Sequence, residues 1–137
     1  MRVEGREDQG PSAVRLIGMH HTLRLHGVIV GHSDLENVEP ELGRAWGVFR
    51  PAEGYELVQP VFRLFARAVP RDGSARYAAG LDRYYKARDA LNLELQDGSG
   101  RTLRTSAIHI VDYSAESGGT LQIDVLIKDE AYWEGRI

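Results

Sequence analysis

The strongest constraint on the fold is a strict alternation of apolar and polar residues in the last third of the chain. Every second residue is apolar over 121–127 and again over 91–95, which is the period of a strand with one buried face. The stretch 102–113 runs between two turn sequences, at 97–100 and 114–119. These features predict a hairpin that a third strand extends into an antiparallel meander.

Further strands are predicted in the first half of the chain. Residues 14–30 are strand-forming, with an earlier strand over 14–19 and a turn near residue 20. A short apolar strand is expected over 45–50. The intervening stretch 33–43 is rich in glutamate, and we interpret it as an acidic loop.

The middle of the chain is predicted to be helical. Apolar residues between 55 and 69 recur at helical spacing, and Pro60 suits a first helical turn. Part of this segment also alternates as a strand would, and we favour a helix over 60–68. A second helix is expected over about 75–89, with Ser74 as its N-cap.

This order of elements predicts an α+β fold with a mainly antiparallel sheet and one or two helices in the middle of the chain. If 60–68 were a strand, the fold would instead be a β-sandwich or barrel with one helix. Residues 1–12 are polar and contain glycine, so we expect a flexible tail. Residues 13–137 are expected to form a single globular domain.

Composition excludes several classes of function. The 137 residues are 42% hydrophobic and 27% charged, as in an ordinary globular protein, and carry a net charge of −3. A negative chain is not typical of nucleic-acid binding, which usually requires a basic domain. There is no cysteine, which fits a reducing cytoplasm, and apolar runs are too short to span a membrane. We therefore expect a soluble, cytoplasmic protein.

One short segment has the highest density of reactive side chains. His32, Asp34 and Glu36 follow an apolar run, and on a strand their side chains would point to the same side. Imidazole and carboxylate groups could bind a metal ion or act as acid–base catalysts. His26 shares the same face if the strand is unbroken, and His109 is a further possible member. The alternative is an ordinary turn, in which these side chains bond to the local backbone.

Two other regions are candidates for a binding surface. Cations and tyrosines are interleaved between 63 and 88, and this composition is common at protein interfaces. The second region is an aromatic pair near the C-terminus. The predicted binding residues are Arg76, Tyr77, Arg83, Tyr84, Lys86, Tyr132 and Trp133.

These patterns predict a binding or interaction module that recognises itself, another protein or a small ligand. We expect a homodimer, or a complex with another protein, rather than binding to nucleic acid or membrane. The alternative is a small metal-dependent or acid–base enzyme that uses His32, Asp34 and Glu36, so enzymatic activity is left open. No sequence motif indicates a cofactor.

Overall fold

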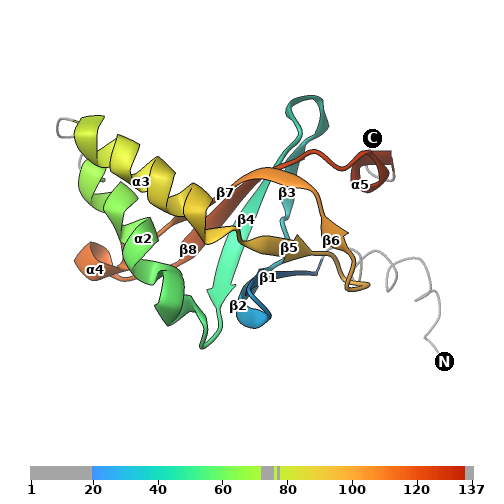
Figure 1. The fold of residues 1–137 in the computed structure, drawn as a ribbon, viewed down its shortest axis with the longest axis horizontal. Coiled ribbons are helices and arrows are strands. Elements are labelled where there is room, and N and C mark those ends of the chain that lie inside the picture. Colours follow the sequence, from blue (N-terminus) through green and yellow to red (C-terminus); the bar gives the residue numbers. More distant parts are fainter. Residues whose placement is uncertain (1–19, 72–75, 77, 135–137) are drawn as a thin grey trace.

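A computed structural model describes residues 20–71, 76 and 78–134, and its strands all pair antiparallel (Figure 1). The strands are β1 (His21–Leu25), β2 (Val28–Ser33), β3 (Asn37–Glu39), β4 (Arg44–Pro51), β5 (Glu94–Gln96), β6 (Thr102–Leu103), β7 (Thr105–Val111) and β8 (Leu121–Ile127). The helices are η1 (Pro40–Leu42, a 3-10 turn), α2 (Tyr55–Ala68), α3 (Ala78–Leu91), α4 (Ser114–Ser117) and α5 (Glu130–Glu134). The predicted α+β class is confirmed, and two helices lie in the middle of the chain.

The sheet curls into a nearly closed barrel. Its strand order is β6-β5-β1-β2-β4-β8-β7, with β3 paired to β4. The first and last strands of this order, β6 and β7, are separated in sequence only by Arg104. They form one bent strand that joins the two edges of the sheet. The three strands of the predicted meander follow one another along the chain as expected. The middle strand, however, pairs with β5 through its first part, β6, and with β8 through its second part, β7.

The turn between β1 and β2 falls inside the segment predicted as a continuous strand. Leu25 pairs with Val28, so His26 and Gly27 alone make the turn, and both have positive φ, +49° and +86°. Two such residues make the tight hairpin turn whose twist matches antiparallel strands. The expected strand is therefore interrupted at His26 and Gly27, whereas residues 28–30 are in a strand as predicted. Its earlier part, 14–19, lies outside the described residues.

The predicted acidic loop is partly a strand. β2 and β3 both pair with β4, and the short stretch between them bulges. Within this bulge Leu35 has φ +45° and its N–H donates to Ser33 Oγ, so that the leucine side chain turns into the core. Glu36 accepts a hydrogen bond from Val48 N. A Cβ at Gly47 would overlap this glutamate, which explains the glycine opposite the bulge.

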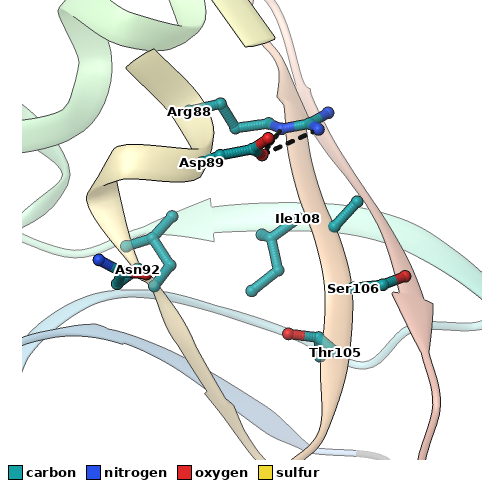
Figure 2. A pocket seen from close by; sticks show the side chains of 8 residues that line it. Arg88, Asp89, Asn92, Thr105, Ser106 and Ile108 are labelled. Atoms are coloured by element: carbon teal, nitrogen blue, oxygen red, sulfur yellow. Dashed lines mark hydrogen bonds and ion pairs between the residues drawn. The ribbon is translucent and has the colours of Figure 1, made fainter. Parts of the chain in front are cut away.

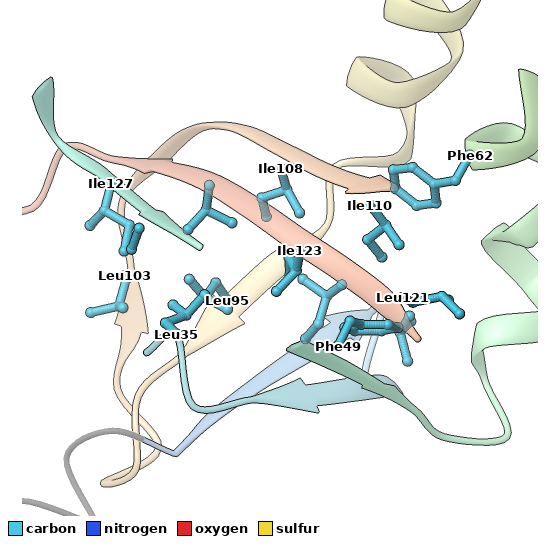
Figure 3. Packing of buried hydrophobic residues seen from close by; sticks show 14 of the residues in the cluster. Leu35, Phe49, Phe62, Leu95, Leu103, Ile108, Ile110, Leu121, Ile123 and Ile127 are labelled. Carbon is cyan, nitrogen blue, oxygen red and sulfur yellow. The ribbon is translucent and has the colours of Figure 1, made fainter. Parts of the chain in front are cut away.

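Inward-facing residues of the strands fill the barrel (Figure 3). The alternation in β8 is confirmed, because Leu121, Ile123, Val125 and Ile127 are buried while Gln122, Asp124 and Leu126 face outward. The helix α2 packs against β2 and β7, and its Phe62 lies near Ile110 at one side of this core (Figure 3). The helix begins at Tyr55, earlier than predicted, so Pro60 lies in its second turn rather than its first.

The second helix, α3, runs beside α2 (Figure 1) and packs mainly on it. Tyr84 is its only fully buried residue and meets the rings of Phe62 and Phe65. The helix continues to Leu91, and Asn92, at φ +54°, ends it, so the strand expected from residue 91 begins only at Glu94. The predicted tail at 1–12 and the cap Ser74 lie outside the described residues.

A buried carboxylate connects α2 to the sheet. Asp112 is fully buried and accepts hydrogen bonds from Tyr55 Oη at 2.5 Å and Gln59 Nε2 at 3.0 Å. Ser114 donates to the same carboxylate from both its backbone N and its hydroxyl. Burial opposes ionisation, but these hydrogen bonds outweigh it and hold the pKa of Asp112 at about 2. The side chain is a structural link between α2, β7 and α4.

Candidate functional site

The predicted cluster of His32, Asp34 and Glu36 is spread along the outer side of β4. Asp34 lies 3.3 Å from Arg50 Nη2 and 2.9 Å from His20 Nδ1. Glu36 reaches further along β4, to the backbone N of Val48. Asp34 and Glu36 therefore both reach β4 but bind different partners, and the bulge at Leu35 interrupts the strand alternation on which their predicted shared face depends.

The histidines of this cluster are separated by the hairpin. His32 Nδ1 lies 3.3 Å from Thr22 Oγ1 on the neighbouring strand. His26 occupies the tight turn at the hairpin tip, so the strand is broken and the expected shared face of His26 and His32 is wrong. Within the described ranges no three His, Asp or Glu side chains are arranged to hold a metal ion. Acid–base chemistry at His32, Asp34 and Glu36 stays a prediction.

The predicted binding residues divide into exposed and buried sets. Arg76, Arg83 and Lys86 are exposed, and Lys86 pairs with Asp82 one turn earlier. Tyr84 is fully buried, and Tyr77 lies outside the described residues.

The C-terminal aromatic pair packs back on the barrel. Tyr132 and Trp133 are both buried, and Trp133 Nε1 donates to the backbone oxygen of Ile127 at 2.8 Å. Tyr132 also meets the ring of His21 edge-on. Tyr84, Tyr132 and Trp133 are therefore buried core residues, and little of each ring is exposed to a partner.

A groove lies between α3 and the outer face of β7 and β8, with a volume of about 360 Å³. We call it the α3–sheet groove. It is lined by Phe65 of α2, Tyr85 and Arg88 of α3, Arg44 of β4, Ala107 and His109 of β7, and Asp124 and Leu126 of β8. A volume of this size lies in the range of small-molecule sites.

The register of β7 and β8 builds the floor of this groove. Ile108 and Ile110 point into the barrel, so Ala107 and His109 point outward. They stand opposite Leu126 and Asp124 in the neighbouring strand. The short side chain of Ala107 leaves the floor hollow, and α3 does not fill it because that helix packs on α2.

A tyrosine and a histidine are hydrogen-bonded beneath the groove. The Tyr84 hydroxyl is bonded to His109 Nδ1, and the Arg88 guanidinium lies over the Tyr84 ring, 5.6 Å from its centre. Burial lowers the pKa of His109 to about 4 and raises the pKa of Tyr84 above its usual value. Both side chains are therefore uncharged near neutral pH.

Ion pairs from Arg44 to two carboxylates form the other side of the groove. Arg44 donates from Nε and Nη2 to Asp124, at 3.0 and 2.6 Å, and from Nη1 to Glu39 at 3.0 Å. These hydrogen bonds raise the pKa of the Arg44 guanidinium well above its usual value. Arg44 also stacks on the ring of Trp46, 4.0 Å from its centre. The charge of Asp124 is thus neutralised within the wall of the groove.

A smaller pocket of about 170 Å³ continues the groove toward the end of α3 (Figure 2). Arg88 and Ala107 line both spaces. The pairing of β7 with β8 shifts between Thr105 and Ala107, so Ser106 is an extra, bulged residue beside this pocket. Arg88 is held there by an ion pair with Asp89 at 3.0 Å.

Comparisons with known protein families, with curated proteins and with solved structures find no match to this chain. The geometry of the groove therefore carries the functional interpretation. No helix in the described part of the chain is long and apolar enough to cross a membrane.

Most groove residues were missed by sequence reasoning. The sequence predicts His109 only as a further member of the His32 cluster and does not single out Asp124. One signal was available: aligning the predicted hairpin 102–127 in register would have placed His109 opposite Asp124 on the outer face. No local pattern predicts that Tyr85 and Arg88 of α3 line the groove, because their position depends on how α3 packs on α2.

Proposed function

We propose that this protein is a binding module and that the α3–sheet groove is its ligand site. The groove accepts an aromatic or aliphatic group of a small ligand. The observation that carries this proposal is a hollow, mainly apolar groove lined by a few polar groups that include a histidine of strongly lowered pKa. Such a combination is typical of ligand sites.

Exposed apolar side chains at the rim support the proposal. Tyr85 is 45% exposed and Leu126 is 39% exposed, although each could be shielded by a ligand. Phe65 supplies a further ring inside the groove. A cytoplasmic location belongs to the same proposal, since the chain contains no cysteine.

The test uses 8-anilinonaphthalene-1-sulfonate, a fluorescent aromatic anion, with folded protein at pH 7.5. We expect saturable binding to the wild type and at least tenfold weaker binding to Leu126→Asp. The matched control is Leu57→Asp, because Leu57 is 61% exposed on α2 and does not line the groove. Thermal melts check that both variants are folded.

Two results would contradict the proposal. The first is equal binding by wild type and Leu126→Asp. The second is a concentration-dependent dimer in sedimentation velocity that Leu126→Asp dissociates, because the groove would then be a self-association surface. The predicted homodimer is tested by the same measurement.

A further inference from the structure

The hydrogen bond to Tyr84 beneath the groove determines whether the other ring nitrogen of His109, Nε2, donates or accepts a hydrogen bond. Tyr84 Oη is bonded to His109 Nδ1. A phenol hydroxyl is a stronger donor than a neutral imidazole N–H, and an imidazole nitrogen is a stronger acceptor than a phenol oxygen, so we assign the shared proton to Tyr84. A neutral imidazole with an accepting Nδ1 carries its proton on Nε2. His109 therefore presents an N–H donor.

This donor has no partner among the described residues. The imidazole lines the groove, and its other nitrogen is the one bonded to Tyr84. The nearest competing acceptor by register is Asp124, but both of its oxygens already accept from Arg44. An N–H group in a half-buried site gains most from an acceptor on a ligand.

The two arginines of the groove differ in how fully carboxylates neutralise their charge. Arg44 is compensated by both Asp124 and Glu39. Arg88 has a side chain only 16% exposed, yet its ion-pair partner is the exposed, sequence-adjacent Asp89. An ion pair with a solvent-exposed partner is weak, so Arg88 keeps capacity to attract an anion.

We propose that the ligand of the groove is an aromatic carboxylate: its ring lies between Phe65, Tyr85 and Leu126, and its carboxylate accepts from His109 Nε2 beside Arg88. This inference rests on the proposed function of the groove and adds the chemical class of the ligand. Charge-assisted hydrogen bonds from histidine and arginine to a carboxylate are stronger than those to a neutral amide. We therefore expect the groove to bind an aromatic acid more tightly than the corresponding amide.

The experiment compares 2-naphthoate with 2-naphthamide by isothermal titration calorimetry at pH 7.5, because the two probes share a ring and differ in charge. We expect the acid to bind wild type at least tenfold more tightly. Arg88→Gln should weaken naphthoate about fivefold and leave naphthamide unchanged. Arg67→Gln is the matched control, since Arg67 lies exposed on α2 outside the groove, and it should change neither affinity.

A direct readout of His109 completes the test. Nitrogen-15 NMR of wild type should show a protonated Nε2 and an unprotonated Nδ1, and naphthoate should shift Nε2. His109→Leu should abolish the preference for the acid; if that variant unfolds, Arg88→Gln still decides the question.

The possible results separate this inference from the proposed function. Equal affinity for both naphthalene probes, with both lost in Leu126→Asp, would overturn acid selection and leave the groove as the ligand site. A proton on Nδ1 in the NMR spectrum would also overturn it. Absence of binding by either probe and by the anilinonaphthalene sulfonate would overturn the inference and the proposed function together.

Discussion

The half-buried His109 at the floor of the groove should make the stability of this protein depend on pH. Burial lowers the pKa of His109 to about 4 from an ordinary 6.5. The unfolded chain therefore takes up this proton at a higher pH than the folded chain does. The stability that His109 contributes is complete above about pH 6.5 and is lost progressively as the pH falls toward 4.

The size of this effect follows from the two pKa values. Each pKa unit corresponds to about 1.4 kcal/mol, so the full difference is about 3 kcal/mol. Between pH 7.5 and pH 5 the linkage relation gives a loss of about 2 kcal/mol. With an unfolding entropy of roughly 0.3 kcal/mol/K for a chain of this length, Tm should fall by about 7 °C from this group alone.

The assay compares urea unfolding of wild type and His109→Gln at pH 7.5 and pH 5. The glutamine carbonyl can still accept the Tyr84 proton but does not titrate, so the variant isolates the contribution of the imidazole. We expect wild type to lose about 2 kcal/mol more than the variant over this interval. Identical losses in the two proteins would refute the reasoning, as would an NMR titration that places the pKa of His109 near 6.5.

Three further substitutions test the fold. Asp112→Ala leaves buried donors without an acceptor and should reduce the free energy of unfolding by about 3 kcal/mol in urea titrations; a loss under about 1 kcal/mol would contradict the link. Gly47→Ala places its Cβ 2.9 Å from the backbone N of Glu36 and should lower stability by about 1–3 kcal/mol, partly restored by adding Glu36→Ala; an unchanged Tm would show that the bulge is free to move. Trp133→Ala should destabilise by about 3–5 kcal/mol in the same titration, whereas an exposed interface residue would change stability by less than about 0.5 kcal/mol.

The candidate site was only partly predictable, because its residues come from elements far apart in the chain. His109 and Asp124 face each other through the register of one hairpin, and local pattern contains that information. Arg44 and Arg88 reach the groove from β4 and α3, and no local pattern brings them there. The His32 cluster was locally dense, yet the hairpin turn at His26 and the bulge before Glu36 gave its members separate partners.

By itself the sequence determined the α+β class, the hairpin and the strand 121–127, since alternation and turn residues act over a few neighbouring positions. Only the tertiary structure decided that the sheet curls into a barrel, because the strand across Arg104 must pair with both β5 and β8. Burial of Tyr84, Tyr132 and Trp133 was likewise a tertiary outcome. An aromatic side chain suits a core and an interface equally well, and which of the two it occupies depends on what the rest of the chain places over it.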